Sequence, residues 1–381
     1  MISNMKVVIF ADKSYNYVKP LATGLHNTLL SMGHESFIWY DGLYWLQRLN
    51  LFKVLCADIY RLFLNLRSGS KKRYIYRFWN LLFFYNNKRR KILENCDCIV
   101  VVYNCPSAFK PIKRLNYLRK KYRKPIINYD FHYLPNQGWW SRLKEIDGHC
   151  GLEQFDWYLP VGLITEFAVP NQIPKIYNCI GMDINSHDLY PDQDQFCVLL
   201  DFPRPGHEER RKKEKEILEN LGIKYYELSG RYTTDEIRSI YRKSSIYIIS
   251  WRESFGLPII ELQLCGAKVM SPYKEWVPAH FLGKSIYERG DGYLGKNFII
   301  YNNEIEFKEI LLREKNEINY QLNIENFQNE YPLYDHIDKN ELENWLHKIE
   351  SGTITYKTHL RFSEYNQYIS LSDNFEKSDI K

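Results

Sequence analysis

The chain has 381 residues, of which 45% are hydrophobic; this predicts a packed protein of two domains and excludes an intrinsically disordered one. Aromatic residues make up 16% of the chain and the formal net charge is +6, a composition that suits flat stacking surfaces or an interfacial protein. The first ten residues show no leader signature, and residues 20–34, the longest stretch without Asp, Glu, Lys or Arg, are too short to span a bilayer.

The first half of the chain alternates apolar runs of strand length with helix-like segments. One helix is expected to begin at Pro20 and to end at Gly33, in keeping with the preference for proline at helix starts and glycine at helix ends. This alternation predicts a mostly parallel sheet. The predicted strands are 6–12, 36–40, 96–103 and 124–131, and the predicted helices are 20–33 and 113–124.

A second alternating run follows a Pro-, Gly- and Asn-rich stretch, and the domain boundary is placed near residues 173–175. It predicts a second parallel sheet. The predicted strands are 195–200, 224–230, 245–250 and 267–272, and the predicted helices are 209–222, 233–244 and 258–265.

Eight cysteines lie at 56, 96, 98, 105, 150, 179, 197 and 265, several of them inside apolar runs. No CxxC pair or Cys/His cluster with zinc spacing is present in the sequence. We interpret them as reduced, mostly buried thiols of a cytosolic protein.

The segment ESFGLPIIE brackets an apolar turn with two carboxylates, Glu253 and Glu261. Pro258 can take the first helical position, and the residue before it, Leu257, is a poor N-cap. The first backbone N–H groups of this helix therefore lack a side-chain partner and favour a phosphate, which Gly256 allows to approach closely.

Carboxylates beside a phosphate suit hydroxyl groups, from which they accept charge-assisted hydrogen bonds. A nucleotide sugar has this arrangement, with ribose on one side of the phosphate and the sugar on the other. The alternative is a loop whose glutamates are simply solvated, and the residues alone leave both readings open.

The turn and the following LCGAKVMSP resemble the E-x7-E signature of retaining family 4 glycosyltransferases with the GT-B fold, although Ser254 replaces a usual glycine. Residues 21–36, 155–162 and 177–191 are similar to further segments of that family, with Gly162 where serine is usual. The implied fold class is α/β, with two Rossmann-like doubly wound domains facing a central cleft.

The resemblance also implies domain roles. Residues 1–174 would be the N-terminal acceptor-binding domain, 175–340 the nucleotide-sugar-binding domain, and 341–381 a C-terminal helix with a mobile tail. Residues 43–93 would be an insertion in the first domain.

Site residues follow from the same resemblance. Glu261 would bind ribose hydroxyls, Glu253 would contact the transferred sugar or its phosphate, and the backbone of Ser254, Phe255, Gly256 and Leu257 would bind the diphosphate.

The family also neutralises the diphosphate with basic residues after the first strand of the second domain. Here that loop is DFPRPGHEERRKK, without the usual G-R-x-x-x-x-K-G, and the candidates are Arg204 and Arg210; for Arg210 the alternative is an exposed helix charge. Asp130 and His132, at the end of an N-terminal strand, are the candidates near the donor sugar, although a lone histidine is more often structural.

The implied reaction moves a sugar from a UDP- or GDP-sugar to a glycan or glycolipid with retention of configuration, in surface polysaccharide or lipopolysaccharide biosynthesis. Electrostatic stabilisation of the departing diphosphate would need no metal. Two alternatives are a DNA-modifying glucosyltransferase and an inactive nucleotide-sugar-binding scaffold.

Residues 43–93 hold twelve Lys and Arg and one acid, Asp58, among many large apolar side chains. A basic amphipathic segment of this kind predicts peripheral attachment to an anionic membrane on the cytoplasmic face, and a lipid-linked acceptor. The alternatives are ordinary core helices with bases outside, and nucleic-acid binding, which we expect least.

Three further motifs are discounted. GxGxxG at 290–295 is typical of a dinucleotide site, but here it precedes a strand instead of following one. DxD at 192–194 is the metal motif of the other major glycosyltransferase fold, but here it begins a strand instead of ending one. ERRKKEKE at 209–216 could be a nucleic-acid patch, but its acids interleave with its bases, as on a solvated helix face.

Overall fold

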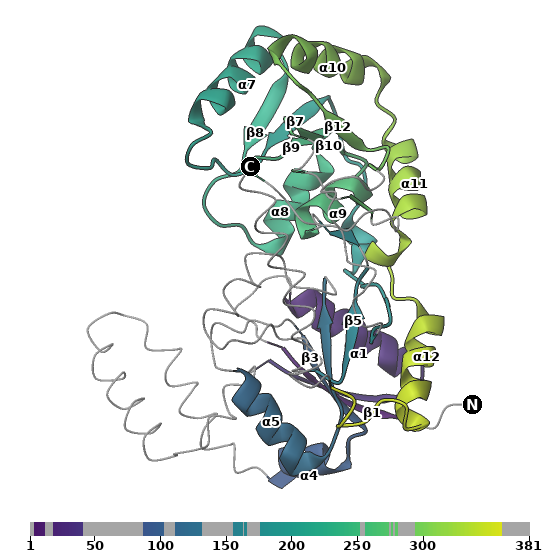
Figure 1. Cartoon of the computed structure of the whole chain (residues 1–381). Helices are drawn as coiled ribbons and strands as arrows, with labels where there is room; N and C mark the ends of the chain where they lie inside the picture. Colours follow the sequence, from purple (N-terminus) through teal and green to yellow (C-terminus); the bar gives the residue numbers. More distant parts are fainter. Residues whose placement is uncertain are drawn as a thin grey trace.

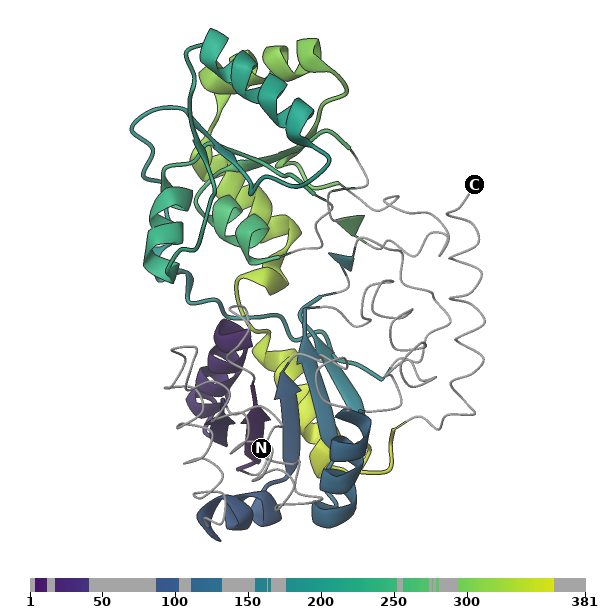
Figure 2. The ribbon, with the colours of Figure 1, turned by 90° about the vertical axis from the view of Figure 1, so that its left-hand side faces the viewer.

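The computed structural model describes residues 4–11, 18–40, 87–102, 111–131, 155–162, 164–165, 176–251, 256–273, 276, 279–280 and 294–359. These residues form two lobes, each built around a parallel five-stranded sheet (Figures 1 and 2). The predicted fold class, two Rossmann-like doubly wound α/β domains, is confirmed.

The described elements are listed in chain order. The strands are β1 (Lys6–Phe10), β2 (Glu35–Trp39), β3 (Cys98–Val102), β4 (Ile126–Asp130), β5 (Trp157–Pro160), β6 (Ile164–Thr165), β7 (Cys197–Leu200), β8 (Lys224–Glu227), β9 (Ile246–Ile248), β10 (Lys268–Ser271), β11 (Ala279–His280) and β12 (Phe298–Ile300). The α-helices are α1 (Val18–Ser31), α4 (Asn87–Asn95), α5 (Pro111–Tyr122), α7 (Glu208–Asn220), α8 (Thr234–Arg242), α9 (Leu257–Leu264), α10 (Glu304–Glu317), α11 (Tyr320–Glu330) and α12 (Lys339–Glu350).

Both faces of the N-terminal sheet are buried, as a parallel sheet requires. Its strand order is β2-β1-β3-β4-β5. Val7 and Ile9 belong to the same buried cluster as the apolar residues of α1 and α12, whereas Val8 and Phe10 belong to the cluster that includes residues of α4 and α5. The period of two along β1 thus directs alternate side chains to two helical layers.

The C-terminal sheet repeats this arrangement with the strand order β12-β10-β9-β7-β8. Val198 and Leu200 of β7 cluster with residues of α7 and α10, and Leu199 clusters with residues of α8, α9 and α11. Counted along the chain, both sheets have the order 2-1-3-4-5. The connections therefore reverse direction between β1 and β3 in one sheet and between β7 and β9 in the other, and ligands of open α/β sheets bind beside the carboxyl ends of strands at such switch points.

Two neighbouring segments connect the lobes. Residues 176–184 lead from β5 toward β7, and residues 331–338 lead back to α12; Met182 N–H donates to the Leu333 carbonyl at 2.9 Å and Asp338 N–H donates to the Ile180 carbonyl at 2.8 Å. Gly181 has φ +76°, and a Cβ there would lie 2.4 Å from the His336 carbonyl oxygen, so only glycine fits this crossing.

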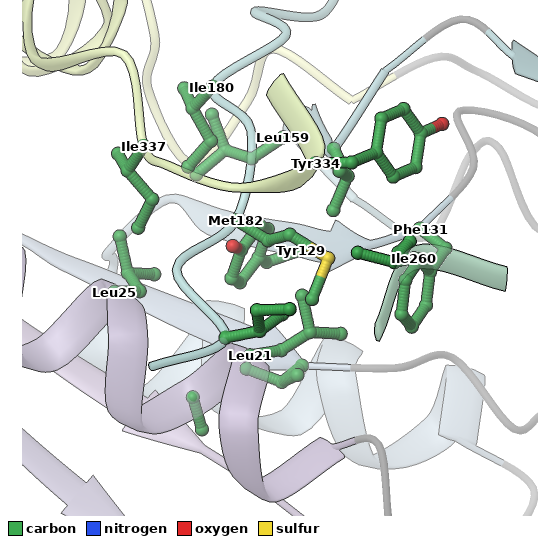
Figure 3. Packing of buried hydrophobic residues seen from close by; sticks show 14 of the residues in the cluster. Leu21, Leu25, Tyr129, Phe131, Leu159, Ile180, Met182, Ile260, Tyr334 and Ile337 are labelled. Atoms are coloured by element: carbon green, nitrogen blue, oxygen red, sulfur yellow. The ribbon is translucent and has the colours of Figure 1, made fainter. Parts of the chain in front are cut away.

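A single buried cluster extends across this junction. It contains residues of α1, of the first connecting segment, of η7 (Pro332–Tyr334) and of α9 (Figure 3). Tyr129 of β4 donates its hydroxyl to the Gly181 carbonyl at 2.8 Å, and β6 of the first lobe pairs antiparallel with β11 of the second. Apolar packing and backbone hydrogen bonds therefore both join the lobes.

The helix α12 packs on the N-terminal lobe although it follows the C-terminal lobe in sequence (Figure 1). Asn178 donates to Glu341 Oε1 at 2.6 Å and accepts from Lys348 Nζ at 3.1 Å. Beyond the helix, the Asp156 carboxylate accepts the His359 N–H at 3.1 Å. The predicted tail beyond residue 359 lies outside the described residues, as does the basic aromatic stretch except for 87–93, and the domain boundaries stay predictions.

Candidate functional site

The switch point of the C-terminal sheet collects the ends of several elements. The strands β7 and β9 both end there, and α7 and α9 begin after them in sequence. The cavity beside the ends of β7 and β9 has a volume of ≈ 270 Å³. Its lining residues are Pro203, Arg204, His207, Glu208, Arg210, Arg211, Lys212, Lys215, Glu227 and Ser250.

The helix α9 starts as the sequence predicts, without a side-chain cap. Its N-cap is Gly256, with φ −101° and ψ 168°, so Leu257 is the first helical residue and Pro258 the second, one position later than expected. The helix is followed by Gly266 at φ +83°, the left-handed conformation common at helix ends. Of the predicted diphosphate-binding backbone, Gly256 and Leu257 are described; Ser254 and Phe255 lie outside the described residues.

Glu261 lies on α9 and is buried. Its Oε1 accepts from Arg238 Nε at 2.9 Å and from Arg238 Nη2 at 2.6 Å. Burial raises the pKa of the Glu261 carboxyl, and the Arg238 guanidinium opposes that rise. Its second oxygen, Oε2, accepts no hydrogen bond from any described residue, which leaves one acceptor for a ligand hydroxyl.

Arg238 is fixed by further acceptors. Nη1 donates to the Asn185 carbonyl at 3.0 Å and to the Asp188 carboxylate, and Nη2 donates to the Ile184 carbonyl at 3.0 Å. The guanidinium therefore connects α8, α9 and the segment that enters the C-terminal lobe. Pairing a buried arginine with several oxygens in this way positions the Glu261 carboxylate.

The two basic residues predicted for the diphosphate both line the cavity. Arg204 is exposed, on the loop after β7. Arg210 is mostly buried; its Nε lies 3.3 Å from Glu214 Oε1, and its buried Nη1 has no hydrogen-bond partner among the described residues. A buried guanidinium nitrogen without an acceptor favours an anion or ordered water.

Arg211 is a cavity residue that the sequence did not single out. It is buried; Nη1 lies 3.1 Å from Glu214 Oε2, and Nη2 donates to the Asp201 carbonyl and to the Ser250 hydroxyl. It thereby joins the ends of β7 and β9. The spacing of Arg211, Glu214 and Leu218 places all three on the buried face of α7, so the interpretation of 209–216 as only a solvated face is wrong for this stripe.

The charge of the lining is positive. Five Lys and Arg side chains face two Glu side chains, and His207 adds a nitrogen heterocycle. The lining thus combines an excess of cations with the start of α7, whose N-cap His207 makes no side-chain cap hydrogen bond. Both features favour an anionic ligand.

The N-terminal candidates are described only in part. Asp130 ends β4, is half-buried, and its Oδ1 accepts the Phe131 N–H at 2.8 Å. Phe131 belongs to the buried cluster that also includes Ile260 of α9 (Figure 3), so β4 ends close to the junction of the lobes. His132 and Glu253 lie outside the described residues.

Comparisons with known proteins give only distant likenesses. No family model matches the chain, and no curated protein matches its sequence. Among solved structures, CalG4, the calicheamicin glycosyltransferase, matches over 91% of this chain and 99% of its own with 11% identity and a TM-score of 0.44. HepE from Anabaena in complex with UDP matches over 91% and 100% with 13% identity and a TM-score of 0.46.

The catalytic domain of starch synthase IV from Arabidopsis thaliana, bound to ADP and acarbose, matches over 97% of this chain and 99% of its own, with 13% identity and a TM-score of 0.40. These scores are low, and the fold class rests on the strand order and packing described above. Membership in glycosyltransferase family 4 stays a prediction.

Proposed function

We propose that this protein is a glycosyltransferase that uses a nucleotide-diphosphate sugar as donor. The observation that carries the proposal is the cationic cavity at the switch point between β7 and β9, where five Lys and Arg side chains face two Glu side chains. A diphosphate is the anion that such a lining neutralises, and a doubly wound sheet binds its ligand at this place.

In this proposal Arg204 and Arg210 neutralise the diphosphate, with the backbone at Gly256 and Leu257 beside it. The free oxygen of Glu261 accepts a ribose hydroxyl while Arg238 fixes the carboxylate. Glu253 contacts the transferred sugar or its phosphate. Guanidinium groups and backbone N–H groups stabilise the departing nucleoside diphosphate electrostatically, without a metal. The acceptor hydroxyl attacks the anomeric carbon from the face that the diphosphate leaves, which retains the configuration, and its proton passes to the departing phosphate oxygen.

Asp130 and His132 are proposed to lie near the transferred sugar, since β4 ends close to the lobe junction. The acceptor is proposed to be a glycan or lipid-linked glycan of a surface polysaccharide pathway, bound by the N-terminal lobe and presented at the cytoplasmic face of a membrane through the basic stretch 43–93. None of the described helices is long and apolar enough to cross a bilayer. Sedimentation with anionic liposomes at low and high salt tests the surface attachment. The same measurement with duplex DNA tests the alternative of nucleic-acid binding.

The test of the donor proposal compares two buried, ion-paired carboxylates of the same lobe. Glu261→Ala removes the proposed ribose ligand. Glu314→Ala is the matched control, because Glu314 is equally buried and accepts from Lys268 Nζ at 2.8 Å at the amino end of β10, the opposite edge of the sheet.

Calorimetric titration with UDP and GDP should show affinity reduced roughly tenfold or more for Glu261→Ala, the effect of losing charge-assisted hydrogen bonds. Glu314→Ala should lower stability and leave nucleotide affinity unchanged. Unaltered affinity in Glu261→Ala would show that the site is misplaced, and binding without turnover of any UDP- or GDP-sugar would favour the inactive scaffold.

A further inference from the structure

A group of aromatic rings lies beside the cationic cavity and takes no part in the roles proposed above. It comprises His207 before α7, Trp251 after β9, and Tyr273 and Trp276 after β10. These residues follow three neighbouring parallel strands, so they share the carboxyl edge of the sheet with the cavity. We call this group the aromatic platform.

The rings of the platform touch one another. Trp251 and Trp276 have centroids 6.1 Å apart with planes at 36°, and His207 lies 5.6 Å from Trp251 and 5.2 Å from Trp276. Tyr273 lies 4.8 Å from Trp276. The gap between the two indoles is too small to admit another ring, so Trp276 and His207 act as a backing for Trp251.

Exposure distinguishes the platform from ordinary core packing. Trp251 is 49% exposed and Tyr273 is 44% exposed, whereas Trp39, Trp157 and Trp345 are buried. A half-exposed indole that its neighbours fix from behind presents a flat apolar face to solvent. Such a face suits stacking of a planar or ring-shaped ligand.

Two residues connect the platform and the cavity. His207 lines the cavity and contacts both indoles, and the Arg210 guanidinium carbon lies 4.7 Å from the Trp276 ring centroid while its side chain also lines the cavity. A ligand that places an anionic group in the cavity therefore brings an adjoining ring to the platform. Nucleotides have this combination of phosphate and planar base.

We infer that the aromatic platform binds the nucleobase of the donor by stacking on Trp251, while the diphosphate occupies the adjoining cavity. This inference rests on the proposed function and adds a consequence for specificity. Stacking uses the π-face that every base has, so it discriminates weakly between bases. The protein should consequently bind UDP and GDP with similar affinity.

The experiment titrates the full chain and its variants with UDP, GDP and inorganic pyrophosphate. Trp251→Ala should weaken binding of both nucleotides roughly tenfold to a hundredfold, the range expected for the loss of one base–aromatic stack, and leave pyrophosphate binding unchanged. Trp251→Phe retains a stacking face and should restore most of the nucleotide affinity. Tyr226→Ala is the control, because Tyr226 is 40% exposed on β8 and lies outside the platform and the cavity lining.

Each other outcome overturns the inference. If Trp251→Ala binds both nucleotides as the wild type does, or loses pyrophosphate equally, the base does not stack there and the donor proposal stands without it. If the wild type binds one nucleotide far more tightly than the other, the prediction that the site discriminates weakly between bases is wrong. A wild type that binds neither nucleotide would overturn the donor proposal and this inference together.

Discussion

Replacing Arg238 with methionine should destabilise the C-terminal lobe strongly. The change keeps an unbranched apolar stem but removes the guanidinium, which supplies the donors that reach Glu261. The Glu261 side chain has 8% of its surface exposed, so water cannot replace those donors. The Ile184 and Asn185 carbonyls and the Asp188 carboxylate lose a donor at the same time.

The expected cost is about 3–5 kcal/mol in the free energy of unfolding, the range for removing one partner of a buried ion pair and leaving the other charge behind. Denaturant unfolding of wild type and variant, followed by circular dichroism, measures this difference. The double variant Arg238→Met with Glu261→Met should recover part of the loss, because it leaves no buried charge at the pair.

The loss of stability in Arg238→Met should also depend on pH. In Arg238→Met nothing opposes the rise that burial causes in the Glu261 pKa, so the folded carboxyl binds its proton more tightly than the unfolded one, whose pKa is about 4.3. Between these two pKa values the folded state carries more protons, and stability falls as pH rises. The difference between variant and wild type should therefore be smaller at acidic than at neutral pH.

Two results would refute this reasoning. A loss below about 1 kcal/mol would mean that the pair is effectively solvated. A deficit that grows toward acidic pH would mean that Glu261 is held charged by something other than Arg238.

Tyr301→Phe should lower the free energy of unfolding by about 1.5–3 kcal/mol, because it removes the hydrogen bond that the Tyr301 hydroxyl donates to the buried Glu214 carboxylate at 2.6 Å. Urea unfolding measures the difference, and an unchanged stability would show that water replaces the hydroxyl. Cys265 is fully buried, and burial raises the pKa of its thiol to about 12, so iodoacetamide should leave it unmodified in the native protein at pH 8 and alkylate it after denaturation. Mass spectrometry maps the sites, and rapid native labelling of Cys265 would contradict its burial.

Much of the fold follows from local pattern. The apolar runs at 6–12 and 195–200 contain the strands β1 (Lys6–Phe10) and β7 (Cys197–Leu200), and the turn at Pro258 lies at the start of a helix that Gly266 follows, because each depends on neighbours in sequence. The uncapped start of α9 was also predictable, since Gly256 and Leu257 carry no side-chain acceptor. These features need only propensity and capping rules.

The parts that escaped prediction depend on residues brought together from a distance. Arg238 occupies one oxygen of Glu261 from a helix 23 positions earlier, which no local motif encodes. Trp251 and Trp276 meet only because β9 and β10 are neighbours in the sheet. Arg211 had a local signal, its spacing to Glu214 and Leu218, but the density of charge around it obscured the buried stripe.

The return of α12 to the first lobe determines the order in which a ribosome can complete the molecule. The sheet built from β1, β3 and β4 is synthesised early. Trp345 of α12 belongs to the same buried cluster as Val7 and Ile9 of that sheet, but it is translated after the whole second lobe. The nascent first lobe must therefore wait with part of an apolar face uncovered. Domains usually mature from the amino end during synthesis; in this protein the lobe that is made first is finished last.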